Sequence, residues 1–175
     1  MIDVKALSDL SYGLFIVSSE KDGKFNGLIA NSVFQVTAQP AQLAIALNKK
    51  SLTHDYIMSS KKFCVQPLME TAQMPFIGIF GFRSGRDFDK FSKVQYKVNG
   101  EGLPVVTENT LAVLSVEVKQ SIDLGTHTMF IGPIQEAEVL CDACKPLTYD
   151  YYQTVLKGKT PKGATTFKEY QGGVK

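Results

Sequence analysis

The residues best suited to chemistry lie in the run KKSLTH, from Lys49 to His54. Two lysines, two hydroxyls and an imidazole occur there, directly before an amphipathic segment. Ser51 or Thr53 is a good helix N-cap, and a helix N-terminus presents unpaired N–H groups with partial positive charge. The run therefore predicts a phosphate-binding site at the start of a helix. Simple helix capping beside solvated lysines is the alternative interpretation of this run.

Two strand-like segments, residues 28–37 and 42–48, precede this turn and would position it. Gln39-Pro40 separates them, because proline lacks the N–H that a sheet ladder uses. Bulky and small residues alternate along the second segment, in the order Leu43, Ala44, Ile45, Ala46, Leu47 and Asn48. This alternation predicts a strand with one bulky apolar face and one small face. A neighbouring helix or strand is the ordinary occupant of a small face, and a flat ligand ring is the alternative.

Two further polar groups occur later in the chain. The run RSGRDFDKF, residues 83–91, mixes three basic residues with two acids, a serine and a glycine. Such a run either contacts a polar ligand or forms an exposed loop with salt bridges, and the loop is the more usual case. His127 follows the turn DLGT at the start of an expected strand. A lone histidine at a strand end is usually a surface residue.

The elements around these groups predict a chain rich in strands. Further strands are expected at residues 12–19, 63–68, 111–120 and 127–140. The last two form a hairpin around a turn at 123–126. A short helix is expected within 71–82, and the clearest helix at 146–156. The rest of the chain, rich in Gly, Lys and Thr, is either a mobile tail or an arm that orders against a partner subunit.

Composition limits the classes of function. At 175 residues and 44% hydrophobic, the chain can bury one core, so a single domain with a tail is expected. A net charge of +2 lacks the basic excess of a protein whose main partner is nucleic acid. No apolar run approaches the ~18 residues of a membrane span, and the start MIDVKALSDL does not resemble a signal peptide. We therefore expect a soluble cytoplasmic protein.

The cysteines are Cys64, Cys141 and Cys144, too few for a disulfide scaffold. Cys64 lies in an expected strand and is predicted to be a small buried hydrophobe. The single CxxC lacks a second pair or a histidine cluster, so no metal site is expected and two free thiols are the default. A reversible disulfide, or a metal shared across a dimer, is the alternative. Glycine-rich dinucleotide motifs, phosphate loops and GxSxG elbows are absent from the sequence.

Three segments in order resemble the flavin reductase-like family with the FMN-binding split-barrel fold. They are NGLIANSVFQVTAQPAQLAIALNKKSLTHDYI, FGFRSGRDFDKF and DLGTHTMFIGPI. The resemblance covers most of residues 5–140. The segment PLTYDYYQTVLKGKTPKGATTF is further similar to the C-terminal end of one subgroup. Members of that subgroup are NAD(P)H:flavin oxidoreductases that stand alone or are fused to rubredoxin in anaerobic bacteria.

The resemblance implies a mainly β fold with a few helices. A six-stranded antiparallel split barrel that binds FMN is expected over residues 1–145. The C-terminal helix and arm, residues 146–175, are not expected to form a separate domain. The resemblance also implies a homodimer with FMN near the dimer interface, and NADH or NADPH as the electron donor. Rubredoxin or another small redox protein is a further expected partner, whereas nucleic acid and membranes are not.

The activity implied is transfer of hydride from NAD(P)H onto flavin, and of electrons onward to free flavin, ferric iron or a redox protein. The flavin performs the redox chemistry, while the protein supplies position and electrostatics. An FMN electron-transfer module reduced by a partner protein is one alternative. A flavin-binding protein without turnover, or a relative of the split-barrel oxidases that act on pyridoxamine phosphate, is another.

The resemblance also assigns site residues. Contacts to the isoalloxazine and ribityl chain are implied for Ala30, Asn31 and Ser32. Contacts to the ribityl chain and phosphate are implied for Asn48, Lys50, Ser51, Thr53 and His54. The second motif adds Ser84, Gly85, Arg86, Asp87 and Lys90 as cofactor-binding residues. His127 is the one residue expected to act in catalysis, by placing the nicotinamide, and Thr126 stands where the motif usually has an aspartate.

Overall fold

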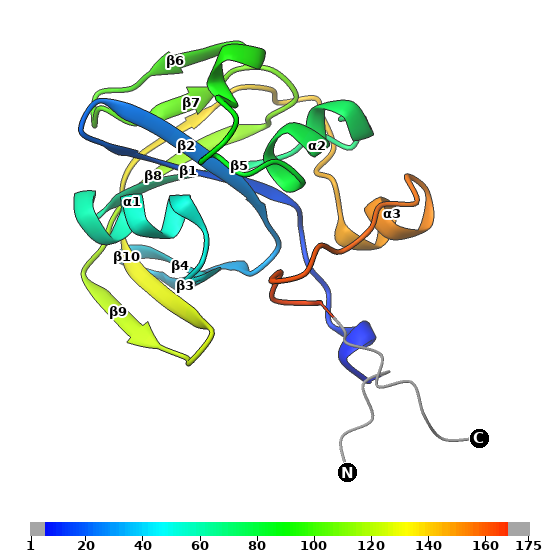
Figure 1. The fold of residues 1–175 in the computed structure, drawn as a ribbon, viewed down its shortest axis with the longest axis horizontal. Coiled ribbons are helices and arrows are strands. Elements are labelled where there is room, and N and C mark those ends of the chain that lie inside the picture. Colours follow the sequence, from blue (N-terminus) through cyan, green and yellow to red (C-terminus); the bar gives the residue numbers. More distant parts are fainter. Residues whose placement is uncertain (1–5, 168–175) are drawn as a thin grey trace.

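The computed structural model describes residues 6–167, which are mainly β (Figure 1). The strands are β1 (Phe15–Lys21), β2 (Lys24–Ala30), β3 (Val33–Ala38), β4 (Ala41–Asn48), β5 (Lys62–Pro67), β6 (Tyr96–Val98), β7 (Pro104–Val106), β8 (Ala112–Glu117), β9 (Gln120–Asp123) and β10 (His127–Val139). The helices are α1 (Leu52–Ser60), α2 (Met74–Gly81) and α3 (Tyr149–Thr154), with short 3₁₀ turns η1 (Ala6–Asp9) and η2 (Phe91–Lys93). Within residues 6–167, each helix is too short or too polar to cross a membrane.

Eight antiparallel strands form one sheet in the order β2-β1-β5-β8-β10-β4-β3, with β9 paired to β10 beside this path. β10 joins the two halves, because its first part pairs with β4 and β9 and its second part with β8. A Cβ on Gly132 would lie 1.9 Å from the carbonyl oxygen of Glu117, so only glycine fits at this crossing. The two ends of the path, β2 and β3, are joined by Asn31 and Ser32 alone. The sheet therefore curls into a barrel that the chain itself closes.

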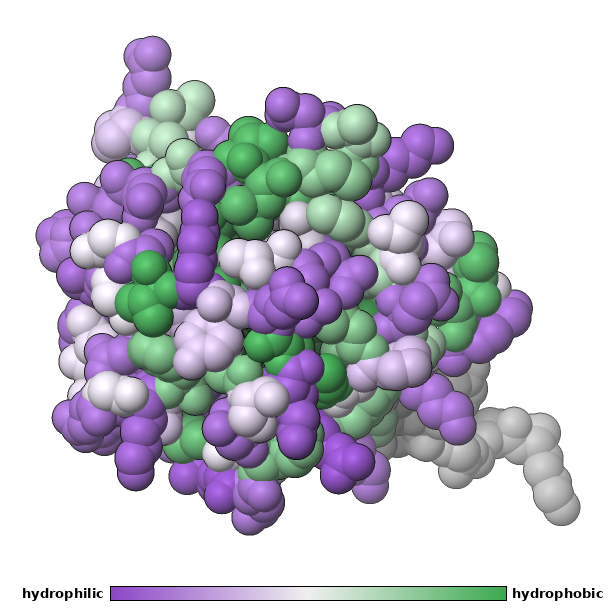
Figure 2. All heavy atoms as spheres, turned by 90° about the horizontal axis from the view of Figure 1, so that it is seen from above, coloured by the Kyte–Doolittle hydropathy of each residue, from purple (hydrophilic) through white to green (hydrophobic). Residues whose placement is uncertain are grey.

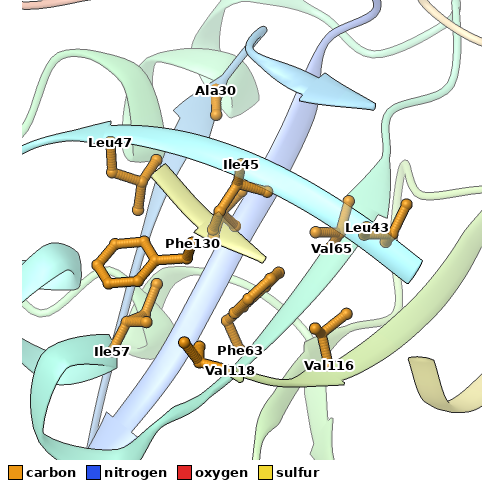
Figure 3. Close-up of a cluster of buried hydrophobic side chains, with 11 residues drawn as sticks. Ala30, Leu43, Ile45, Leu47, Ile57, Phe63, Val65, Val116, Val118 and Phe130 are labelled. Atoms are coloured by element: carbon orange, nitrogen blue, oxygen red, sulfur yellow. The ribbon is translucent and has the colours of Figure 1, made fainter. Parts of the chain in front are cut away.

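The interior of the barrel is the main core (Figure 3). Leu43, Ile45 and Leu47 of β4 point into it, so the predicted bulky face of this strand is confirmed. Phe63 of β5 and Phe130 of β10 fill the centre and are both 0% exposed. Each such side chain contributes roughly 2–3 kcal/mol of transfer free energy on burial. The inward face is thus fixed by hydrophobic burial, and the alternate residues of β4 face outward.

A second apolar cluster lies on the outer side of β1 and β2, under α2 and α3. Ile77 and Phe80 of α2 and Tyr152 of α3 pack there with Ile16 of β1. β1 is buried on both sides, because Val17, next to Ile16, faces the barrel interior. α1 packs on β1 and β2 elsewhere and contributes Ile57 to the main core. The barrel is therefore covered by helices along its first two strands.

Several expected boundaries were wrong. The expected strand at 28–37 is two strands, because the chain leaves its pairing with β1 after Ala30, and Ser32 then bonds Ala46 of β4 through both its carbonyl and its hydroxyl. The expected hairpin of 111–120 with 127–140 contains the additional strand β9. These two differences, with the separate β6–β7 pair, explain why the strands exceed the expected six. The helix expected at 146–156 is only Tyr149–Thr154, while the short helix expected within 71–82 is confirmed as α2.

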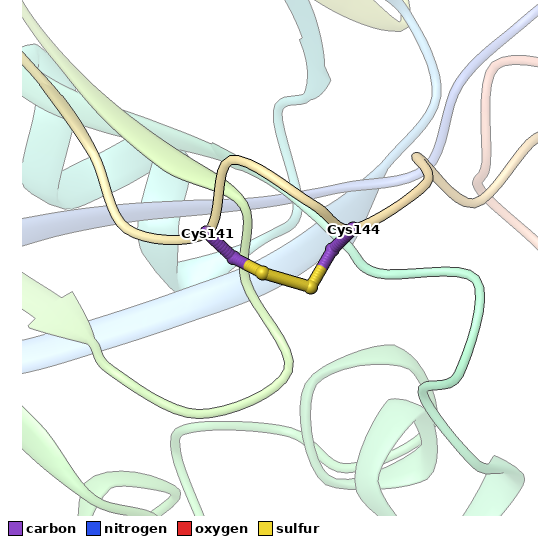
Figure 4. The surroundings of a disulfide bond; sticks show 2 residues. All are labelled: Cys141 and Cys144. Carbon is purple, nitrogen blue, oxygen red and sulfur yellow. A yellow bond between two sulfur atoms is a disulfide. The ribbon is translucent and has the colours of Figure 1, made fainter.

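The cysteines divide into a pair and a buried thiol. Cys141 and Cys144 form a disulfide in the loop after β10, so the expectation of two free thiols was wrong (Figure 4). Their Cα atoms lie 5.7 Å apart, within the ordinary range for a disulfide. Cys64 is 0% exposed, as predicted, and burial raises the pKa of its thiol to about 12. Cys64 is therefore an unreactive core residue at neutral pH.

Lys90 is a buried lysine that joins α2 to β2. Its Nζ donates hydrogen bonds to the carbonyl oxygens of Gly27 (2.7 Å) and Phe80 (3.3 Å). The residue is only 4% exposed, and it forms no salt bridge with any residue between 6 and 167. Burial lowers the pKa of its amine to about 8, because the charged form loses hydration. The positive charge of Lys90 is thus held inside the protein by carbonyl dipoles.

This burial predicts a pH dependence of stability. The amine has a pKa of about 8 in the folded protein and about 10.4 in the unfolded chain, so the unfolded state binds more protons between these values. The free energy of unfolding should therefore gain a contribution as pH rises from about 8 to 10, on the order of 3 kcal/mol at most. Urea unfolding of wild type and Lys90→Met across this range measures the effect. The free energy of unfolding of the wild type should rise with pH relative to that of Lys90→Met, which lacks the titrating amine.

Lys93→Met is the matched control, because Lys93 is exposed on the adjacent turn η2. Its unfolding curve should follow that of the wild type at every pH. A constant difference between wild type and Lys90→Met from pH 7 to 10 would contradict the lowered pKa.

Candidate functional site

A cleft of about 800 Å³ lies where the barrel is closed by the chain. This volume is within the ~300–1,000 Å³ of small-molecule and cofactor sites. Its lining comes from the β2–β3 junction, the turn from β4 into α1, the loop at 83–85, the turn at 125–127 and the C-terminal residues 161–165. The cleft therefore gathers segments from across the whole sequence.

The turn from β4 into α1 is held by local hydrogen bonds. Asn48 Oδ1 accepts from the backbone N–H of Lys50 (2.9 Å), and Ser51 Oγ accepts from the N–H of His54 (3.2 Å). Ser51, one of the two N-cap candidates that the sequence offered, is thus the N-cap. Lys49 pairs with Asp123 (2.6 Å), whereas Lys50 forms no salt bridge within the described residues. A helix N-terminus and a free lysine therefore line this end of the cleft and favour an anion.

The β2–β3 junction forms a polar wall over a small-residue floor. Ser32 Oγ donates to the carbonyl oxygen of Ala46 (2.8 Å), while Ser32 O accepts from the N–H of Ala46 (3.1 Å). Asn31, next to it, is 6% exposed. Ala30 and Ala46 also line the cleft, so the small face predicted for β4 does border it. The wall offers amide and hydroxyl groups, and the small side chains of Ala30 and Ala46 beside it leave room for a planar group.

The loop at 83–85 is docked on a buried polar residue. A Cβ on Gly85 would lie 2.1 Å from Asn26 Oδ1, so glycine is required there. Asn26 is 4% exposed, and its Nδ2 donates to Thr53 Oγ1 (3.0 Å) in α1. The loop and the N-terminal part of α1 are therefore held together through Asn26. The sequence reasoning missed Asn26 as a lining residue, although a polar residue in an otherwise apolar strand was a signal.

His127 lies at the start of β10, opposite Asn48 of β4. Its Nδ1 is 2.8 Å from Thr126 Oγ1, and its Nε2 is 3.2 Å from the carbonyl oxygen of Gly163. A carbonyl oxygen can only accept, so these partners assign the proton of the neutral ring to Nε2 and make the Thr126 hydroxyl the donor to Nδ1. Thr126 thus orients His127 in place of the aspartate that is usual in the family motif.

Eleven of the fourteen expected site residues line the cleft. They are Ala30, Asn31, Ser32, Asn48, Lys50, Ser51, Thr53, Ser84, Gly85, Lys90 and His127. Arg86 is outside the lining and pairs with Asp55 at the surface (2.7 Å), and Asp87 follows it in the same loop. His54 is also outside the lining.

His54 lies behind the cleft, between α1 and β10. It is 8% exposed, its Nε2 is 2.9 Å from Thr128 Oγ1, and its ring packs 5.4 Å from that of Phe130. Its imidazole therefore supports the wall that carries His127, one residue before Thr128. The sequence analysis assigned both Ser51 and His54 to the FMN site. Ser51 faces the cleft, whereas His54 faces the core.

The chain matches the family model described as "Flavin reductase like domain" over residues 7–155. It is 46% identical over 168 residues to a ferric-chelate reductase (NAD(P)H) of Archaeoglobus fulgidus, covering 96% of this chain and 99% of that one. It is 44% identical over 166 residues to a high molecular weight rubredoxin of Moorella thermoacetica, covering 95% of this chain and 72% of that one.

Solved structures show the same fold. An NADH:FAD oxidoreductase of Streptomyces globisporus superposes with a TM-score of 0.75 at 22% identity, over 85% of this chain and 90% of that one. The sequence resemblance and the mainly β split-barrel architecture are thereby confirmed. The family model spans the barrel and four of the five segments of the cleft, all but the C-terminal one. Since the match covers most of the chain, the chain belongs to the flavin reductase like family.

Proposed function

We propose that the chain is an FMN-binding oxidoreductase that takes hydride from NADH or NADPH and passes electrons to free flavin, ferric iron or a small redox protein. The observation that carries this proposal is the cleft itself, which combines an anion-favouring helix N-terminus with a polar wall over a small-residue floor. Support comes from relatives that are named as reductases using NAD(P)H and from family membership. We also propose a cytoplasmic location, because the nicotinamide donors are cytoplasmic metabolites.

The donor set of the cleft fits FMN. Lys50, Ser51 and the N-terminus of α1 suit a phosphate, since backbone N–H groups, a hydroxyl and an ammonium group converge there. Asn48 also lines the cleft with a polar side chain, as a polyol chain requires, and the Thr53 hydroxyl behind it accepts from Asn26. Asn31 and Ser32 stand over the small floor, where a planar ring has room. The cleft therefore offers groups that suit the phosphate, the ribityl chain and the ring of FMN.

The residues of this chain bind and orient the reactants. Bound FMN supplies the hydride and single-electron chemistry. His127 carries its N–H at Nε2 and donates it to the carbonyl oxygen of Gly163, so the carboxamide of a nicotinamide would accept from His127 by sharing or replacing this bond. The charge of Lys90 and the N-terminus of α1 give the cleft a positive potential, which favours anionic ligands. These groups act by position and electrostatics, so the chain itself undergoes no covalent change.

The phosphate assignment predicts a selective loss in Lys50→Gln. The variant should bind FMN roughly five- to tenfold more weakly, because one exposed cation beside a phosphate is worth about 1 kcal/mol. Riboflavin, which lacks the phosphate, should bind both proteins equally. Fluorescence titration measures both constants, with Lys61→Gln at the opposite end of α1 as the control. An equal loss for both flavins would contradict a phosphate contact.

The redox proposal predicts anaerobic bleaching of bound FMN by NADH or NADPH. His127→Ala should slow this reduction, by roughly tenfold or more, while changing the FMN dissociation constant much less. Stopped-flow absorbance measures the rate, and later addition of ferric chelate, free flavin or rubredoxin identifies the acceptor. Bound FMN that stays oxidised with both nicotinamides, but is reduced by a partner protein, would instead identify an electron-transfer module.

We also propose that the protein is a homodimer formed through the outer face of β3, β4, β10 and β9. Directly paired residues share a face, and two rows lie on this one: Phe34, Ala44 and Ile131, then Ala46, Met129 and Ile122. Phe34 and Ile122 are 51% and 44% exposed. Figure 2 views the molecule from another side, the top of Figure 1 where β6 and β7 lie, and the hydrophobic residues there form separate clusters among hydrophilic ones. The outer face of the four strands continues into the cleft at Ala46, so a partner there would approach the ligand.

Phe34→Glu should convert the dimer into a monomer, because a charge in an apolar interface remains without a partner. Sedimentation equilibrium gives the mass directly. Val139→Glu is the matched control, since Val139 is 64% exposed at the far end of β10. A wild-type protein that sediments as a monomer at high concentration would contradict the proposal.

A further inference from the structure

Residues 159–167 turn back from α3 and lie along the flavin cleft of their own chain (Figure 1). The sequence suggested either a mobile tail or an arm on a partner subunit, and the structure shows this segment on its own barrel. Residues 168–175 lie outside the described part of the chain. Pro161, Lys162, Gly163, Ala164 and Thr165 all line the cleft. We call residues 159–167 the arm.

The arm is anchored behind the cleft by two tyrosines of α3. Tyr152 donates from its hydroxyl to the carbonyl oxygen of Lys159 (2.9 Å), and the hydroxyl of Tyr149 bonds that of Thr160. Thr166 Oγ1 donates to the Tyr149 hydroxyl as well (3.1 Å). The two rings stack with centroids 5.9 Å apart. Both ends of the arm are therefore tied to one short helix.

Gly163, Thr165 and Thr166 of the arm bond four residues that border the cleft. Asn31 Nδ2 donates to Thr166 Oγ1 (2.7 Å), and the hydroxyls of Ser32 and Thr165 are 2.8 Å apart. The carbonyl oxygen of Gly163 accepts from Asn48 Nδ2 (3.1 Å) and from His127 Nε2 (3.2 Å). These four partners come from the β2–β3 junction, β4 and β10, so the arm bridges three parts of the rim.

Gly163 must be glycine for the arm to reach both partners. Its φ is +92°, a conformation that side-chain-bearing residues rarely adopt, and an added Cβ would lie 3.2 Å from Asn48 Nδ2. The path of the arm is thus specified by its own sequence. About 800 Å³ of the cleft remains with the arm in this position, so the arm bounds the site and leaves it open for a ligand.

We propose that the arm is a wall of the flavin site, which encloses bound FMN and holds His127 in its N–H-donating orientation. This inference rests on the proposed function. The ring and ribityl chain would be covered on the side of Asn31, Ser32 and Asn48, where the barrel itself provides no further strand. Gly163 then acts through His127 as a positioning residue. Thr165 and Thr166 hold the arm against the barrel through their hydrogen bonds to Ser32 and Asn31.

The first test is the double variant Thr165→Val, Thr166→Val, which keeps the shape of both side chains and removes their hydroxyls. Its FMN dissociation constant should rise roughly tenfold, with most of the change in the dissociation rate, because the hydrogen bonds of the arm to Asn31 and Ser32 are lost. Stopped-flow displacement of FMN measures the rate. Thr154→Val is the matched control, because the Thr154 hydroxyl bonds only within α3, to Asp150 O (2.8 Å), among the described contacts.

The second test needs no turnover and uses the wild-type chain. Lys159 and Lys162 are exposed in the arm and are trypsin sites. FMN should slow cleavage after both residues. In a separate measurement, the ¹⁵N chemical shifts of the His127 imidazole should show that Nε2 carries the proton in the wild type. In the double variant the protection by FMN should be weaker.

The outcomes separate the two proposals. Unchanged FMN affinity in the double variant, with no protection of the arm by FMN, would overturn the wall and leave the proposed function intact. Tighter FMN binding in the variant would show that the arm competes with flavin, which also overturns the wall. A wild-type protein that takes up no FMN would overturn both proposals together.

Discussion

The break between β2 and β3 is the constraint on which the site depends. A twisted sheet with two unpaired edges must pair, cover or join those edges. Here the chain joins them through two residues, and Ser32 compensates for the interrupted ladder with two hydrogen bonds to Ala46. Because Asn31 and Ser32 lie outside the β1–β2 ladder, their side chains border the cleft, where they bond the arm. The same interruption that closes the barrel therefore opens the cleft.

Electrostatics then decides what such a cleft can hold. The N-terminus of α1 and Lys50 carry positive potential to one end, while Lys90 keeps a charge inside the protein at the cost of a pKa lowered to about 8. A buried lysine that pairs with no carboxylate among residues 6–167 is unfavourable, so its cost is expected to fall when an anion binds nearby. A site with this arrangement is organised for an anionic ligand before the ligand arrives.

Local signals in the sequence were sufficient for part of this structure. Ser51 as an N-cap and the alternation along β4 depend on neighbouring residues, and both were predictable. The division of residues 28–37 was not, because the polar pair Asn31-Ser32 also fits within one strand, and only the pairing of Ser32 with Ala46 shows that the chain passes there from the β1–β2 ladder to β4. For the same reason His54 could not be separated from Ser51: which one faces the cleft depends on how α1 packs on β10. The disulfide between Cys141 and Cys144 likewise depends on loop geometry that a CxxC alone does not encode.

The histidine at the cleft shows how family membership and individual sequence combine. The family motif accounts for the presence of His127, but an aspartate at 126 would accept from Nδ1 and leave Nε2 as an acceptor in the neutral ring. Thr126 can donate to Nδ1, and the carbonyl of Gly163 requires a donor at Nε2, so both partners favour the same tautomer. Replacing a carboxylate by a hydroxyl thus reverses the hydrogen-bonding character that His127 shows to the cleft. Thr126 and the C-terminal arm therefore favour the same tautomer of His127, and neither segment indicates this on its own.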